Sequence, residues 1–163
     1  MKTLLVVYHT QTGGTQQMAE AAAAGASAEA AVRVRLLHAR EAGAGDVLAA
    51  EGYVFACPEN LAAMAGQLKD FFDRTYYAVL DRANGRPYAS LICAGSDGSN
   101  AARQIERIAT GWRLNAIAPP LIVCTHAQTK EAIERPKLIA AAELVRCSEL
   151  GLAMASGMAL GIF

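Results

Sequence analysis

The chain alternates between short apolar segments and longer stretches of helical character. Residues 3–8, 32–37, 53–57, 89–94 and 121–125 are rich in β-branched and large apolar side chains. Between them, residues 15–31, 64–77, 101–112 and 137–151 are alanine-rich or place apolar residues at three- and four-residue spacings. Nearly continuous apolar strands are typical of a parallel sheet that is covered on both faces. The pattern therefore predicts an α/β three-layer sandwich, with a five-stranded parallel sheet and helices on both faces.

The second segment, VRVRLL at residues 32–37, differs because its polar and apolar residues alternate. Such alternation indicates an edge strand with one partly solvated face. The order of the strands is not in the sequence, but for five strands we expect the common doubly wound order 2-1-3-4-5, in which a ligand binds at the carboxyl ends of the strands beside the first. A six-stranded dinucleotide fold would need a longer chain than these 163 residues, which suit one domain spanning 1–163.

The charge balance argues for small-molecule or protein partners. Lysine plus arginine and aspartate plus glutamate both number 15, without long runs of like charge. We therefore expect no nucleic-acid partner and no binding to an acidic membrane. The N-terminal apolar run is too short for a secretion signal, and the apolar residues 150–163 are too few for a bilayer span.

The cysteine spacing favours reduced thiols over a disulfide framework. No C-x-x-C pair or zinc-ligand spacing is present, so we expect no metal site and a soluble, cytoplasmic protein. The four widely separated residues are Cys57, Cys93, Cys124 and Cys147.

A threonine- and glycine-rich loop links the first strand to the first helix, where free N–H groups and the helix dipole favour an anion. A nucleoside-triphosphate loop would need a lysine, yet none occurs between Lys2 and Lys69, and a dinucleotide loop would need a later glycine. The loop therefore predicts a terminal monophosphate held by neutral donors; the alternative is a simple turn capped by Thr15. Its residues are Thr10, Gln11, Thr12, Gly13, Gly14 and Thr15.

This loop resembles the flavodoxin phosphate loop, [TS]-x-T-G-x-T, which in that family holds the 5′-phosphate of FMN. The resemblance implies a flavodoxin-like fold and FMN as cofactor.

The run PENLAAMAGQLKDFFD at residues 58–73 resembles the NAD(P)H:quinone oxidoreductase branch of this superfamily, of the tryptophan-repressor-binding-protein type, and the related NADPH-dependent FMN reductases. The alternative is that its apolar residues are ordinary helix core. Related chains commonly have glycine where Ala62 stands, and we expect Ala62 to resist positive φ. The resemblance implies that the flavin ring contacts Pro58, Glu59, Asn60, Leu61, Ala62, Ala63 and Met64.

A third loop follows the fourth strand and is again small, polar and glycine-rich. The resemblance implies that it borders the pyrimidine side of the flavin. The alternative is a solvated loop in which Ser99 or Asn100 caps the next helix. Its residues are Ala94, Gly95, Ser96, Asp97 and Gly98.

The resemblance implies an enzyme that takes electrons from NAD(P)H and reduces a quinone or similar acceptor by ping-pong hydride transfer through FMN. We assign no catalytic residue, because buried cysteines and lone histidines such as His9, His38 and His126 are more often structural. The alternative is an electron-transfer flavodoxin without NAD(P)H turnover, although such carriers are usually acidic and carry aromatic residues in the flavin loops. The resembling enzymes form tetramers, so the resemblance is compatible with a homo-oligomer of this chain.

Overall fold

The sheet is built around the first strand, with parallel neighbours on either side. In a computed structural model that describes residues 1–163, the path is β2-β1-β3-β5-β6; β7 also pairs with β5, and β4 pairs with β3. Every pairing is parallel except that between β3 and β4. The strands are β1 (Lys2–Tyr8), β2 (Val32–His38), β3 (Gly52–Asn60), β4 (Ala63–Met64), β5 (Pro87–Ala94), β6 (Asn115–Ala116) and β7 (Leu121–Cys124).

The predicted order is confirmed, with the fifth position divided into two strands. β6 pairs with the beginning of β5 and β7 with its end. Pro119 and Pro120, in the segment between them, have no N–H to donate to the sheet. At the opposite edge, β2 pairs only with β1 and is half-buried over most of its length, as its alternating sequence predicts.

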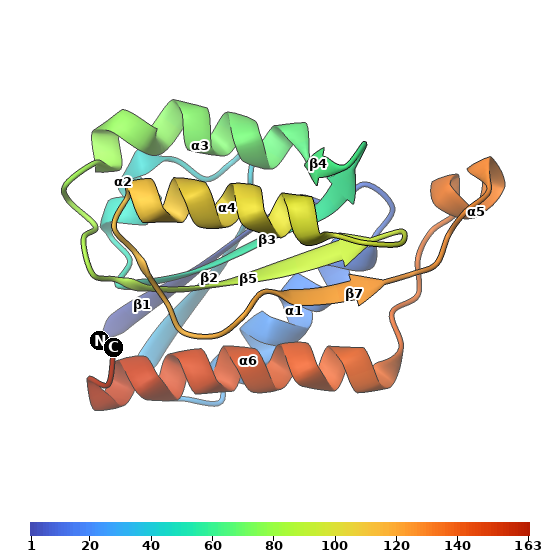
Figure 1. The fold of residues 1–163 in the computed structure, drawn as a ribbon. Coiled ribbons are helices and arrows are strands. Elements are labelled where there is room, and N and C mark those ends of the chain that lie inside the picture. Colours follow the sequence, from blue (N-terminus) through green and yellow to red (C-terminus); the bar gives the residue numbers. More distant parts are fainter.

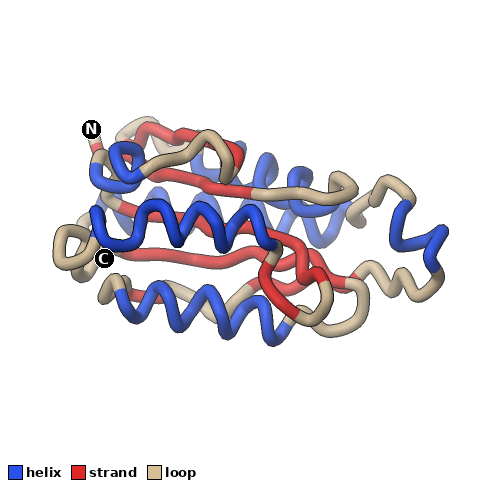
Figure 2. The backbone as a smooth tube through the Cα atoms, turned by 90° about the horizontal axis from the view of Figure 1, so that it is seen from above, coloured by secondary structure: helices blue, strands red, loops and turns tan.

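Helices cover both faces of the sheet (Figure 1). One layer contains α1 (Gly14–Ala26) and α6 (Ala141–Leu160), and the other contains α2 (Ala44–Leu48), α3 (Gly66–Val79) and α4 (Ser99–Gly111). The short helix α5 (Lys130–Glu134) projects beyond the carboxyl ends of the strands in both views (Figures 1 and 2). None of the helices combines the length and apolar character that crossing a membrane requires.

Alternate side chains of each strand enter two separate cores. In β1, Leu5 and Val7 pack toward α3 and α4, whereas Leu4 and Val6 pack toward α1 and α6. Because successive strand residues point to opposite faces, an apolar residue is needed at every position. This requirement explains why the strand segments read as continuous apolar runs.

Two helix predictions differ from the structure. α1 ends at Ala26, before the predicted residue 31. α6 begins at Ala141 and not at the predicted residue 137, and it continues to Leu160, beyond the predicted residue 151. Most of the apolar C-terminal run is therefore helical and packs against the sheet. α1 and α6 approach closely at Gly151, where an added Cβ would lie 1.9 Å from the carbonyl oxygen of Ala22.

Candidate functional site

The threonine- and glycine-rich loop turns sharply into α1. Gly13 has φ of 89° and occupies the N-cap position, a conformation that glycine adopts readily. The Gly13 N–H donates to Thr10 Oγ1 at 3.0 Å, which orients the turn. The alternative with Thr15 as N-cap is therefore wrong, and the Thr15 side chain is left for another role.

Several donors in this loop lack any partner within the protein. The hydroxyl of Thr15, a residue only 1% exposed, is the single buried side-chain polar atom without a hydrogen bond. An unpaired buried hydroxyl costs on the order of 1–3 kcal/mol, which an anion's oxygen would recover. Free N–H groups at a helix N-terminus favour such an anion. The amides without a hydrogen-bond partner are those of Thr10, Gln11, Thr12, Gly14, Thr15 and Gln16.

The second predicted loop is a β-hairpin. β3 continues to Asn60 and pairs with β4 around a two-residue turn in which Leu61 and Ala62 have φ of 50° and 57°. Two consecutive positive φ values match a type I′ turn, which normally uses Asn-Gly. The expectation that Ala62 resists positive φ is therefore wrong: pairing of the flanking residues holds it there, at a cost of about 1–2 kcal/mol per non-glycine residue.

The hairpin is tied to the third loop and to α4. Both carboxylate oxygens of Glu59 accept N–H groups from the beginning of α4, from Gly98 at 2.9 Å and from Ala101 at 3.0 Å. Asn100 Nδ2 donates to the Ala62 carbonyl at 2.5 Å. The Glu59 side chain is thus committed to α4, and α4 is capped at Gly98 rather than at Ser99 or Asn100.

The third loop leaves backbone donors free at the end of β5. The N–H groups of Gly95, Ser96 and Asp97 have no partner in the protein. The Asp97 side chain turns toward α4, where it accepts from Ser99 Oγ at 2.8 Å. Exposed main-chain N–H groups of this kind can donate to the carbonyl oxygens of a heterocycle.

A cavity of about 90 Å³ brings the three predicted loops together at the carboxyl ends of the strands. Among the predicted residues, its walls contain Gln11, Thr12, Pro58, Glu59, Asn60, Ala94 and Gly95. Sequence reasoning missed the other lining residues, Cys93, Thr125, Ala127, Ile133 and Lys137.

The remaining predicted residues lie outside this cavity. Ala63 and Met64 face a separate hollow beside α4. Leu61 and Ala62 form the exposed hairpin tip, whereas Thr10, Gly13, Gly14 and Thr15 form the turn at the beginning of α1.

Comparison with known proteins finds a family match that includes all three loops of the site. The Flavodoxin family profile matches residues 6–134, which include all three loops. The chain belongs to the flavodoxin family. FMN, the cofactor of that family, suits the unpartnered donors of the Thr10–Thr15 loop.

Two curated relatives share part of this flavodoxin-family sequence. A flavodoxin of Aquifex aeolicus is 42% identical over 98 residues, which cover 60% of this chain and 53% of the relative. A protein named NAD(P)H dehydrogenase (quinone), from Acidithiobacillus ferrooxidans, is 30% identical over 95 residues, covering 46% of this chain and 48% of the relative. The chain thus spans about half the length of the curated relatives it matches.

Solved structures share the fold along nearly the whole chain. An archaeal flavodoxin superposes with a TM-score of 0.79 at 21% identity, covering 94% of this chain and 96% of that one. A WrbA-like flavodoxin from Agrobacterium tumefaciens gives a TM-score of 0.74 at 17% identity, covering 99% of both chains. Both likenesses establish the flavodoxin-like α/β fold.

Cysteines near the site of this flavodoxin-family chain are held as neutral thiols. Burial raises the pKa of Cys57 to about 12 and that of Cys93 to about 11. Cys147, on α6, is also buried, and burial raises its pKa to about 11. Since the thiolate is the reactive form, burial disfavours reactivity at these three residues.

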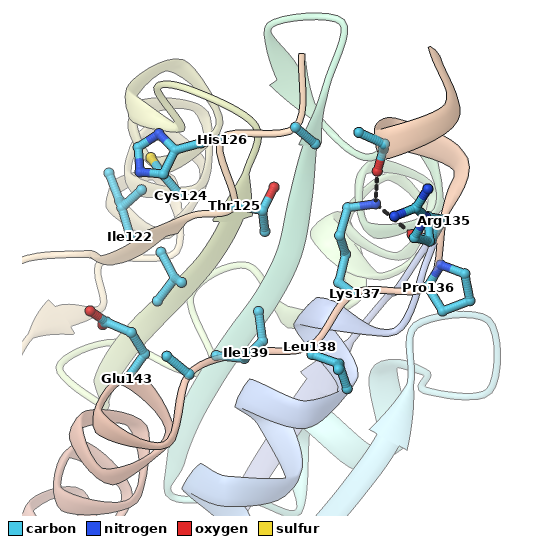
Figure 3. Close-up of a pocket in the computed structure, with 14 residues that line it drawn as sticks. Ile122, Cys124, Thr125, His126, Arg135, Pro136, Lys137, Leu138, Ile139 and Glu143 are labelled. Carbon is cyan, nitrogen blue, oxygen red and sulfur yellow. Dashed lines mark hydrogen bonds between the residues drawn. The ribbon is translucent and has the colours of Figure 1, made fainter. Parts of the chain in front are cut away.

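The histidines lie around the site without facing its cavity. His9 is buried, and its Nδ1 lies 3.3 Å from His38 Nε2. Burial, followed by the neighbouring His38, lowers the pKa of His9. His126 is exposed and borders a larger groove of about 640 Å³ beside β7 (Figure 3).

Proposed function

We propose that this chain binds FMN, with the phosphate at residues 10–15 and the ring between the hairpin and the third loop. The observation that carries the proposal is the set of unpartnered donors at the beginning of α1, above all the buried Thr15 hydroxyl. When bound, FMN would supply the chemistry of hydride and electron transfer.

The residues of the chain divide into three groups in this proposal. Thr12 and Thr15 donate to the phosphate together with the free amides of α1, while Thr10 orients Gly13. Pro58, Asn60 and the amides of residues 95–97 contact the ring. Glu59 is a positioning residue, because it joins the hairpin to α4.

We further propose that the activity is reduction of a quinone or similar small acceptor with electrons from NAD(P)H. Support comes from the groove of about 640 Å³, which shares Thr125, Ala127 and Lys137 with the flavin cavity and so offers space for a second molecule. The formal net charge of +0 offers no strong field for docking a redox protein. The quinone-reducing relative agrees with this activity.

The second candidate is an electron carrier, which the Aquifex aeolicus relative named flavodoxin favours. Anaerobic stopped-flow mixing of the FMN-loaded protein with NADPH or NADH separates the two candidates. Rapid loss of the flavin absorption band supports the reductase. Reduction that occurs only after addition of a separate flavodoxin reductase supports the carrier.

We propose a cytoplasmic setting for this chain. Four free cysteines, three of them buried, suit a reducing cytoplasm.

A homo-oligomer would bury some of the exposed apolar residues, among them Leu138, Val145 and Leu152. Light scattering of the FMN-loaded protein measures the assembly mass directly.

A further inference from the structure

Lys137 lies beside the beginning of α1 although it is more than a hundred residues away in sequence. Its backbone N–H donates to the Thr12 carbonyl at 2.8 Å, and its own carbonyl accepts from Gln17 Nε2 at 2.7 Å. Its Cβ lies 3.3 Å from the position that a Cβ on Gly14 would occupy. The main chain therefore fixes this lysine next to the unpartnered amides.

The Lys137 ammonium is held by neutral oxygens. Nζ donates to the carbonyls of Ala132 at 2.8 Å, Ile133 at 2.7 Å and Arg135 at 2.6 Å, two of which are drawn in Figure 3. The positive charge of Lys137 also lowers the pKa of Cys93, which burial raises. Because Cys93 lies near the end of β5, the field of this charge reaches that end of the strand. No carboxylate forms an ion pair with this ammonium.

The bonds of Lys137 also hold a strap, which we define as residues 125–140. Main-chain bonds anchor its two ends, from Thr125 to Ala94 and from Lys137 to Thr12. Between these ends, residues 128–136 hydrogen-bond only among themselves and to the Lys137 side chain, and none of them is buried.

The strap narrows the flavin cavity. Ile133 and Lys137 form part of the wall of the cavity of about 90 Å³. Small-molecule sites usually occupy at least ~300 Å³, so outward movement of the strap would enlarge this cavity toward that size. Lys137 holds the end of α5 through three carbonyls and so holds the strap in its inward position.

We propose that Lys137 gives the site its selectivity for a phosphorylated flavin, by exchanging the three carbonyls at the end of α5 for the phosphate and thereby releasing the strap. This inference rests on the proposed binding of FMN. Ammonium-to-phosphate hydrogen bonds are charge-assisted, and therefore stronger than bonds to neutral carbonyls. The four-carbon stem and three donors of lysine allow such an exchange without moving its main chain.

The test compares FMN with riboflavin, which has the same ring and no phosphate. In K137M, FMN affinity should fall about tenfold, as expected for loss of one charge-assisted bond, while riboflavin affinity should stay the same or rise, because the strap is no longer held. R135M removes a charge from the same strap, outside the flavin cavity, and should change neither affinity more than about twofold. K137R should retain most of the preference for FMN.

Amide hydrogen exchange provides a readout that does not depend on affinity. In the unsubstituted protein, FMN should speed exchange in residues 131–136, whereas K137M should show fast exchange there with or without FMN. Unchanged FMN affinity in K137M, equal losses for FMN and riboflavin, or no change in exchange on adding FMN would overturn the proposal. Absence of FMN binding to the unsubstituted protein would instead refute the proposed function.

Discussion

The Glu59 carboxylate accepts the Gly98 N–H at 2.9 Å, so a side chain from the hairpin caps the helix that follows the third loop. Glu59→Gln should lower the free energy of unfolding by about 1–2 kcal/mol, because it removes a charge that accepts two N–H groups at a helix N-terminus. It should weaken FMN and riboflavin alike, since the ring loops lose their common support. Urea unfolding and flavin titration measure both effects, with exposed Glu149→Gln as the control.

Thr15→Val should change stability and binding in opposite directions. Without flavin, the variant should be as stable as the parent or up to about 1 kcal/mol more stable, because it removes an unpartnered buried hydroxyl. FMN affinity should fall about tenfold or more, as a phosphate donor is lost. Thr75→Val is the matched control: its hydroxyl donates to the Phe71 carbonyl at 2.7 Å, so stability should fall with FMN affinity unchanged. Equal FMN affinity in both variants would contradict the role of Thr15.

Ala62→Gly should stabilise the protein by about 0.5–1 kcal/mol. The substitution relieves the left-handed conformation at φ 57°, and the greater chain entropy of glycine offsets part of the gain. Ala63→Gly, in the neighbouring strand β4, should destabilise by a similar amount. The urea unfolding midpoints of both variants, compared with that of the parent, measure these changes in stability. A loss of stability in Ala62→Gly would show that the turn is not strained.

Stability should fall as the pH drops through 6.5. Burial is the largest cause lowering the pKa of both His9 and His38, with further contributions from His38 and Arg40 respectively. Because both folded pKa values lie below the unfolded value of about 6.5, the unfolded chain takes up protons first and is favoured below that pH. The free energy of unfolding, measured at pH 7.5 and 5.5, should show the loss.

Matched histidine variants test the source of this pH dependence. His38→Gln should reduce the difference between the two pH values, whereas exposed His126→Gln should retain it. An undiminished difference in His38→Gln would assign the loss to other groups.

Local patterns in the sequence predict the layers, because strand alternation and apolar content report burial directly. The sheet order is in no local pattern and was expected only because it is the usual arrangement of a five-stranded flavodoxin-like sheet. The alternating residues 32–37 marked the edge strand β2 correctly. The hairpin was missed because Leu61-Ala62 lacks the Asn-Gly signature of its turn type. The division of the fifth strand was also missed, although Pro119-Pro120 marks where it occurs.

Tertiary contacts account for the parts of the site that sequence could not show. Lys137 meets Thr12 through a main-chain bond across the fold, beside the packed pair α1 and α6, and no local pattern links the two residues. Glu59 was predicted as a ring contact, but its two bonds to α4 depend on how the hairpin lies over that helix.

Binding of the FMN phosphate by the Thr10–Thr15 loop can be measured directly. Its most direct test is an equilibrium titration of FMN, followed by flavin fluorescence, with the parent protein and the double variant Thr12→Ala/Thr15→Ala. The parent should bind FMN saturably and one to one, and the double variant should lose at least about tenfold in affinity. Failure of the parent to bind, or identical affinity in the double variant, would contradict it.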